Sequence, residues 1–251
     1  NGVTWTADPG VRISNAAFPE VIKLKDGTYR MYMQTTINSV RGIAYSTSTD
    51  SLTWSPVSKI VVNSSGEPFA ATNVGNASVL QLSDGTFLMA YIASAVDGSG
   101  GSLMWATSSD GDTWTKKGFI VDERANQQMS GQGVDGPELV QWDSKRIKLY
   151  FTGHQGIQEL DYVSGNFVGM NNIVLANVKD SKTPAGTFGV GDVTVARFGD
   201  RWHMFFGVGP IENSQSLSQG IYEAGYQAGA LPAPAPTSTP SQSPPVASPS
   251  P

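Results

Sequence analysis

The chain has 251 residues, 39% of them hydrophobic, so it can bury a core of ordinary size as one domain or as two smaller units. Charged residues make up only 15%, and the net charge of -5 comes without a cluster of Lys or Arg. Nucleic acid and anionic membranes are therefore not expected as partners. The absence of cysteine excludes disulfides, thiolate metal sites and thiol nucleophiles. No apolar run is long enough to predict membrane insertion.

A repeated pattern of strands and turns runs through the chain. Residues 19–33 align with residues 77–91, and the pattern returns at 137–151 and, with a turn one residue shorter, at 193–206. The four copies start 58, 60 and 56 residues apart. Each copy turns at Asp-Gly, Asp-Ser-Lys or Gly-Asp, residues that tolerate the positive φ of tight hairpins. The strand after the turn is almost wholly apolar, which predicts burial on both of its faces.

Two of the copies continue into a third strand, at 42–48 and 102–108, followed by a turn that ends in Trp at 48–54 and 108–114. In these turns Asp and Ser can hydrogen-bond the turn's own backbone while Trp anchors a fourth strand. They resemble the Asp-box hairpins of sialidase-type propellers, although they are one residue shorter. The role of such hairpins in those folds is structural, so their aspartates are not expected to be catalytic.

The two ends of the folded region complement each other. Residues 1–6 (Asn-Gly-Val-Thr-Trp-Thr) have the pattern of the second half of such a turn plus a fourth strand, and residues 220–226 that of a third strand. Together, these two segments would supply the third and fourth strands of one four-stranded unit. We therefore expect an all-β propeller of four-stranded antiparallel blades, with four blades closed by an N-terminal strand that completes the last one. A five-bladed ring is the alternative.

The propeller domain is expected to span residues 1–230, and residues 231–251 a separate segment. This segment holds eight of the 15 prolines and no charge. Because proline cannot donate to a strand ladder and little here can be buried, we expect an extended linker. Such linkers commonly join secreted modules, which indicates an extracellular protein with a further module or a wall attachment beyond the linker. A disordered tail without a partner is the alternative.

The repeats, from Asn1 to about Gly229, and the stretch Asp135-Gly136-Pro137 resemble the glycoside hydrolase propellers. These include arabinanases and xylosidases of the family 43 type and the Asp-box sialidases. For the arabinanase and xylosidase group the resemblance implies an axial Asp-Pro base in one blade, an auxiliary Asp in the next and a Glu-Gly-Pro acid in the third. Here the third site has Asp135 in place of Glu. The first site reads Phe-Pro-Glu at 18–20, and the second reads Asn-Ala-Ser at 76–78.

Four acids are candidates for catalysis: Asp135, Glu20, Asp192 and Glu138. They stand at corresponding strand starts, and propeller geometry could bring several of them to one axial cleft. Glycoside cleavage needs two carboxyl groups, roughly 5–5.5 Å apart for retention and about 6.5–9.5 Å apart for inversion. We expect Asp135 to be the general acid, with its pKa raised by burial or by a neighbouring carboxylate, and Glu20 or Asp192 to be the base. Alternatively, these acids cap turns, neutralise basic residues or bind an axial cation. No other metal and no cofactor is expected.

Four further residues are candidates for contacts to a sugar: Asn76, His154, Phe69 and Phe188. Asn76 stands at the axial start of the second copy. His154 is one of two histidines in the chain and could instead be an ordinary hydrogen-bonded strand residue. Phe69 and Phe188 lie in variable regions between blades, where aromatic faces could stack on a sugar ring or simply seal the core.

Two functions follow from these patterns. The first is a secreted inverting glycoside hydrolase that acts on a plant or microbial polysaccharide or oligosaccharide. The second is a non-catalytic extracellular module for glycan binding, adhesion or surface assembly, which the absent second-blade acid favours. Carbohydrate is the expected partner in both, and the sequence leaves open whether the protein is an enzyme.

Overall fold

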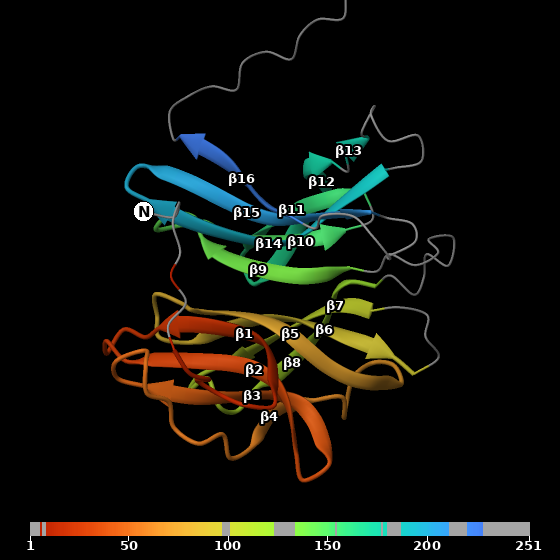
Figure 1. Cartoon of the computed structure of the whole chain (residues 1–251). Coiled ribbons are helices and arrows are strands. Elements are labelled where there is room, and N and C mark those ends of the chain that lie inside the picture. Colours follow the sequence, from red (N-terminus) through yellow and green to blue (C-terminus); the bar gives the residue numbers. More distant parts are fainter. Residues whose placement is uncertain are drawn as a thin grey trace, which may run out of the picture.

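The described residues of this computed structural model form four antiparallel β-sheets (Figure 1). The described parts of the chain are residue 6 and residues 9–96, 101–122, 134–153, 155–176, 178–179, 187–210 and 220–227. In Figure 1 strands β1 to β8 make up the lower half of the molecule and β9 to β16 the upper half. Within the described parts, no helix is long and apolar enough to cross a membrane. The predicted all-β class with four-stranded antiparallel sheets is confirmed.

The first two sheets follow the chain from their inner to their outer strand. The first sheet consists of β1 (Ala16–Lys23), β2 (Tyr29–Ile37), β3 (Val40–Ser48) and β4 (Ile60–Asn63). The second sheet consists of β5 (Ala71–Gln81), β6 (Phe87–Ala95), β7 (Gly101–Ser108) and β8 (Thr115–Val121). The predicted first, second and third strands of both copies are thereby confirmed.

The third sheet repeats this order and the fourth departs from it. The third sheet consists of β9 (Asp135–Gln141), β10 (Ile147–Gly153), β11 (Gly156–Val163) and β12 (Asn166–Ala176). The fourth sheet consists of β13 (Val178–Lys179), β14 (Thr187–Phe198), β15 (Arg201–Pro210) and β16 (Gly220–Gln227). Here β13 pairs with the start of β14, and in the described parts β16 forms the outer edge. The predicted closing strand at residues 1–6 lies outside the described residues, apart from Thr6, which belongs to no strand.

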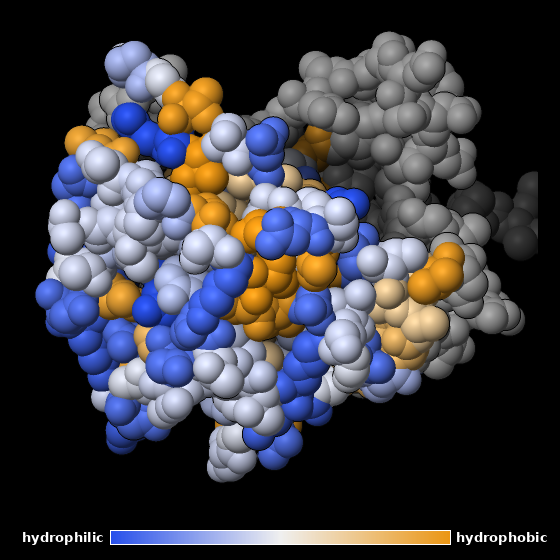
Figure 2. Space-filling view, turned by 90° about the horizontal axis from the view of Figure 1, so that it is seen from below, coloured by the Kyte–Doolittle hydropathy of each residue, from blue (hydrophilic) through white to orange (hydrophobic). Residues whose placement is uncertain are grey.

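Apolar side chains of successive sheets pack face to face in three clusters. The first cluster joins the first two sheets around Tyr32 and Tyr91, and the second joins sheets two and three around Leu149 and Phe151. The third joins sheets three and four around Tyr150 and Trp202. These six residues all come from the apolar second strands, so the predicted burial of those strands is confirmed. On one face of the molecule, hydrophobic residues gather near the middle and hydrophilic ones surround them (Figure 2).

The two Trp-ending turns, which we call the first Asp turn (residues 48–54) and the second Asp turn (residues 108–114), are held by their own side chains. In the second Asp turn, Oδ1 of Asp110 accepts the N–H groups of Asp112 and Thr113, both at 2.8 Å. The Ser108 hydroxyl donates to the same oxygen at 2.9 Å. These bonds lower the pKa of Asp110 to about 2. The first Asp turn repeats the pattern, which agrees with the structural role expected of both.

Strands β1, β5, β9 and β14 are the inner strands, and each contacts the next along the chain. Strands β1 and β14 make no comparable contact in the described parts. Consistent with this, Phe18 and Val21 of β1 are 51% and 46% exposed, while β5 and β9 are largely buried. The inner strands thus surround an axis that the described residues leave open between β1 and β14.

Each inner strand carries a β-bulge at the same place. Two of its residues face one residue of the second strand, and the first of the two has a positive φ. These first residues are Phe18 (52°), Asn76 (47°), Gly136 (54°) and Asp192 (50°). Non-glycine residues adopt such a conformation rarely, and it costs about 1–3 kcal/mol when the surrounding structure enforces it. The four bulges therefore mark one level of the axis at which the backbone is strained.

Candidate active site at the axis

Directly after the bulges, carboxylates and hydroxyls alternate around the axis. The four residues at this level are Glu20, Ser78, Glu138 and Thr194. Ser78 Oγ donates to Glu20 Oε1 at 3.1 Å, and Thr194 Oγ1 donates to Glu138 Oε1 at 2.9 Å. Each glutamate of one sheet thus receives a hydroxyl of the next sheet.

Backbone groups complete these contacts. The N–H of Leu139 donates to Ser78 Oγ at 2.9 Å, and the N–H of Val195 donates to Glu138 Oε1 at 3.2 Å. Ser78 is only 1% exposed, whereas Thr194 is exposed where the ring is open. The bridge from the first sheet through Ser78 to the third sheet is therefore buried, and this level of the axis holds the sheets together.

Burial raises the pKa of both glutamates. The pKa of Glu20 rises to about 8, mainly because burial disfavours its charge and also because Glu138 lies nearby. The pKa of Glu138 rises to about 7, again through burial. Both carboxyls thus lose their protons only near or above neutral pH. Burial disfavours the charged form that a catalytic base needs before it accepts a proton, so Glu20 as the base stays a prediction that this environment does not favour.

One residue before the bulges, a polar cavity of about 190 Å³ opens along the axis. It is lined by Phe18, Gln34, Arg41, Asn73, Gly75, Asn76, Ile92, Ser94 and Asp135. Asp135 Oδ1 accepts the side-chain N–H of Asn76 at 2.6 Å and the N–H of Gly136 at 2.9 Å. Asp135 is exposed, so its carboxyl faces the solvent side of the cavity.

Asp135 occupies a place that small residues fill in the other sheets, namely Ala17, Gly75 and Gly191. The glycines are needed because the second strand of the preceding sheet comes close. A Cβ on Gly75 would lie 2.5 Å from Gln34 Cδ, and one on Gly191 would lie 3.0 Å from Thr152 Oγ1. An acid at this level is thus particular to the third sheet.

Asp192 of the fourth sheet lies beside this acid. Its N–H donates to Thr152 Oγ1 at 3.0 Å, and a Cβ built on Gly136 would lie 3.5 Å from Asp192 Oδ1. Burial raises the pKa of Asp192, and the charge of Asp135 raises it further. The pair therefore combines a carboxyl that accepts two hydrogen bonds with a neighbouring carboxyl whose pKa is raised. Such a pair can move a proton in both directions across a reacting bond.

Known structures share the arrangement of the sheets. An exo-1,5-α-L-arabinanase from a bovine ruminal metagenomic library is 18% identical with a TM-score of 0.57, over 77% of this chain and 64% of its own. The arabinanase of Bacillus subtilis is 13% identical with a TM-score of 0.61, over 90% of this chain and 76% of its own. The family 93 α-L-arabinofuranosidase of Fusarium graminearum, solved with arabinobiose, is 17% identical with a TM-score of 0.59, over 87% of this chain and 65% of its own.

The chain has the fold of the glycoside hydrolase β-propellers. The resemblance predicted from the repeats is thereby confirmed at the level of the fold. This propeller spans slightly less than two thirds of the length of two of these three neighbours. No family model matches the sequence, and no curated protein is significantly similar to it.

The propeller brings together some of the predicted site residues and separates others. Asn76 and Asp135 share the axial cavity with Asp192 alongside, while Glu138 lies in the buried level with Glu20. Phe69 does not line the cavity, because its ring stacks on Phe119 of the outer strand β8 with centroids 5.8 Å apart. This packing favours the alternative expectation, that Phe69 seals the core.

Two other candidates fall on parts of the chain that the structure does not describe. His154 lies outside the described residues. Phe188 belongs to β14, where its backbone pairs with Pro210, but its side chain lies outside the described part. Among the described residues, no group of three or more His, Cys, Asp or Glu side chains could hold a metal ion.

Four polar cavity residues were not among the predicted site residues: Gln34, Arg41, Asn73 and Ser94. Gln34 is only 6% exposed, and its Nε2 donates to Asn73 Oδ1 at 2.8 Å. A signal for Gln34 existed, since it is a polar residue in the otherwise apolar core of β2. Arg41 and Asn73 have no such signal, because polar residues at strand ends are common.

Proposed function

We propose that this propeller is a carbohydrate-active protein that binds the end of a sugar chain in the axial cavity and hydrolyses a glycosidic bond there. The observation that supports this most is the pairing of Asp192 with Asp135. The pKa of Asp192 is raised, and Asp135 accepts hydrogen bonds from Asn76 and from the N–H of Gly136. Two carboxyl groups in unlike environments are what glycoside hydrolysis requires.

The surroundings of Asp192 and Asp135 indicate which is the general acid and which is the general base. Asp192 donates its proton to the leaving oxygen as the bond from that oxygen to the anomeric carbon breaks. Asp135 takes a proton from water as the water oxygen bonds to the same carbon, which gives inversion. These roles reverse the expectation from sequence, which made Asp135 the acid. Asp192, like Asp135, is exposed at its surface, so the reversal follows from its raised pKa, caused by partial burial and by the charge of Asp135, and from the two hydrogen bonds that Asp135 accepts.

The cavity limits the substrate to a small group. Its volume of about 190 Å³ lies below the roughly 300–1,000 Å³ typical of pockets for drug-sized ligands, which suits one sugar residue. Gln34, Arg41 and Asn73 offer hydrogen bonds to hydroxyls, and Phe18 offers an aromatic face. The structural neighbours are arabinanases and an arabinofuranosidase, so an arabinose-containing chain is the first substrate class to test.

Hydrolysis of arabinan, xylan and pyranosidic oligosaccharides by the full chain tests this function. Asp192→Asn and Asp135→Asn should each lower kcat by about 100- to 10,000-fold, the range for the loss of a general acid or base. Glu159→Gln on strand β11, away from the axis, is the matched control and should retain activity. Turnover that survives both axial substitutions would overturn the assignment.

A second function, glycan binding without turnover, is favoured by a specific observation. The second sheet contributes Asn76 to the cavity and the first sheet contributes no ionised acid, because Glu20 is buried. If this is the function, calorimetry will show binding of arabinan fragments that Arg41→Ala weakens, and no product will form over long incubation.

We propose, from composition alone, that the protein is exported and that residues 231–251 connect the propeller to a further module or to a cell wall. For the ring itself we propose four blades, closed by the N-terminal segment on the fourth sheet. A five-bladed ring is the alternative, favoured by the lack of close contact between β1 and β14. Spin labels on Val21→Cys and Thr194→Cys separate the two, because a closed four-bladed ring brings these strands as close as β1 is to β5.

A further inference from the structure

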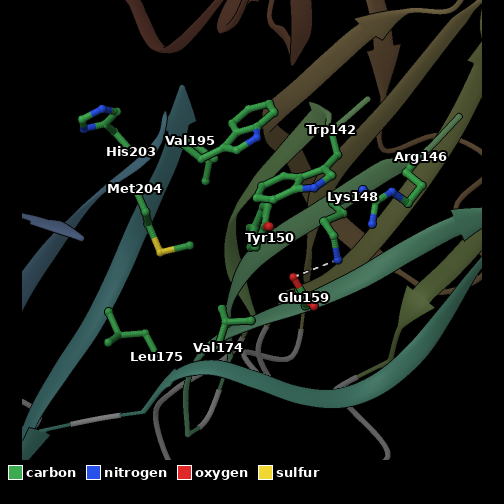
Figure 3. A pocket seen from close by; sticks show the side chains of 11 residues that line it. Trp142, Arg146, Lys148, Tyr150, Glu159, Val174, Leu175, Val195, His203 and Met204 are labelled. Carbon is green, nitrogen blue, oxygen red and sulfur yellow. Dashed lines mark ion pairs between the residues drawn. The ribbon is translucent and has the colours of Figure 1, made fainter. Parts of the chain in front are cut away.

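A cavity with an aromatic lining lies between the third and fourth sheets, away from the axial site. It measures about 430 Å³. In Figure 3, Trp142, Lys148 and Tyr150 lie on one side of it and Met204 of β15 on the other. The rings of Trp142 and Trp202 stack with centroids 4.3 Å apart. The cavity therefore separates two sheets that are elsewhere packed face to face.

The equivalent place between the first and second sheets is filled. There the second Asp turn covers the first sheet: Tyr32 OH donates to the Gly111 carbonyl at 2.8 Å, and Arg30 Nη1 donates to the Asp110 carbonyl at 3.0 Å. Trp114 packs edge-on against Tyr32, with centroids 6.0 Å apart, and against Phe87, at 6.4 Å. One turn thus supplies two carbonyl acceptors and one indole.

The two places correspond residue by residue. Tyr150 pairs with Glu138 across the strands as Tyr32 pairs with Glu20, so Lys148 and Tyr150 stand where Arg30 and Tyr32 stand. By the same register Trp202 of the fourth sheet stands where Phe87 stands in the second. The cavity therefore presents a basic side chain, a tyrosine and an aromatic wall at the places that receive the second Asp turn, and here the basic side chain and the tyrosine also contact Glu159 of β11.

The fourth sheet has no such turn of its own in sequence. After β16 the chain continues Ala-Gly-Ala-Leu-Pro-Ala-Pro, without Asp or Trp. In contrast, residues 1–6 (Asn-Gly-Val-Thr-Trp-Thr) match residues 110–115 (Asp-Gly-Asp-Thr-Trp-Thr) at four of six positions, and Asn replaces Asp at the first. The matching glycine matters, because a Cβ on Gly111 would lie 2.2 Å from Arg30 Nη1.

We propose that the cavity between the third and fourth sheets is the docking site for residues 1–5 of this chain. In this proposal the Trp5 indole packs against Trp202 as Trp114 packs against Phe87. Lys148 pairs with Glu159 at 3.1 Å and with Asp161 at 3.2 Å, so one of the three N–H donors of its ammonium remains for the Gly2 carbonyl. The proposal concerns the turn and not a strand, since Thr6 belongs to none.

Thiol labelling tests the proposal, because the chain contains no cysteine. Met204→Cys places a reporter in the cavity wall, and Leu80→Cys places a control in the wall of a separate cavity between β1 and β5. Both are labelled in the otherwise unchanged full chain and again with Gly2→Ala or Trp5→Ala added. Full-length single substitutions avoid a truncation that fails to fold.

The expected result is labelling of Cys at position 204 that is about tenfold or more faster with either added substitution, corresponding to an opening made easier by roughly 1.4 kcal/mol or more. Labelling at position 80 should not change. The proposal would be overturned if the cysteine at position 204 were labelled at the same rate with and without Gly2→Ala or Trp5→Ala. This holds whether that common rate is slow or fast. Activity plays no part in this readout, so its outcome is independent of the proposed function.

Discussion

Asn76 Nδ2 and Asp135 Oδ1 lie 2.6 Å apart, and this hydrogen bond joins the second sheet to the third at the mouth of the axial cavity. Asn76 can make it because it occupies a bulge with a φ of 47°, which turns its side chain toward the third sheet. The strained backbone of one sheet thus fixes the carboxylate of another.

Asn76→Ala should weaken the function of Asp135 without unfolding the propeller. A hydrogen bond to a charged group contributes about 1.5–3 kcal/mol, less at an exposed site, so we expect kcat/KM to fall by about tenfold. Asn172→Ala, which removes an amide bonded to Glu159 at 2.7 Å far from the axis, is the control. Unchanged kinetics in Asn76→Ala would show that Asp135 needs no partner.

Stability should fall as pH rises, because of Glu20 and Glu138. Their pKa values rise from 4.5 to about 8 and about 7 on folding, so the folded state holds more protons than the unfolded state between these values. Their favourable contribution is complete below pH 4.5 and is lost as pH rises to 7 and 8. We expect Tm to drop by at least about 4 °C between pH 5 and pH 8.

Glu20→Gln provides the matched comparison for this pH dependence. An amide keeps the shape of the protonated carboxyl and cannot ionise, so thermal unfolding of the variant should depend less on pH than that of the parent chain. A variant with the same slope would show that the loss of stability arises elsewhere.

Ser78→Ala should destabilise the protein by about 1–3 kcal/mol, since it leaves the buried N–H of Leu139 and the carboxyl of Glu20 without their shared partner. Thr194→Ala removes the corresponding hydroxyl at an exposed place and should cost less. Denaturant unfolding of both variants measures the difference. Equal losses would contradict the buried bridge.

Gly111→Ala should destabilise the propeller by about 2–4 kcal/mol, because a Cβ there would meet Arg30 and Tyr32 in addition to requiring a φ of 71°. Gly27→Ala also requires a positive φ, of 89°, but meets nothing within 4 Å, so about 1 kcal/mol is expected. Thermal unfolding of the two variants measures the difference, which is the destabilisation caused by the steric clash at Gly111 beyond that caused by the positive φ.

The carboxyl of Asp192 should titrate at lower pH once its neighbour is neutral. The pKa of Asp192 is raised by burial first and by the charge of Asp135 second, so Asp135→Asn should lower it while leaving part of the shift. Carbon-13 NMR of labelled aspartate follows this directly. No movement would mean that the two carboxyls do not interact and could not share the proposed reaction.

The sequence by itself determined the repeated strands, their antiparallel hairpins and the Asp turns. These features depend on neighbouring residues: apolar runs, Asp-Gly turns and side chains that bond their own backbone. The spacings of 58, 60 and 56 residues also aligned the four axial strands correctly, since the bulges at Phe18, Asn76, Gly136 and Asp192 fall at the same spacings.

Only the tertiary structure decided which acids face the cavity. In a strand, a shift of one residue turns a side chain to the opposite face, and a bulge changes this alternation locally. Asp135 therefore stands before its bulge and lines the cavity, while Glu20 stands after its own and is buried. The charge state of each acid depends on hydrogen bonds and burial supplied by other sheets, which lie more than 50 residues away in sequence.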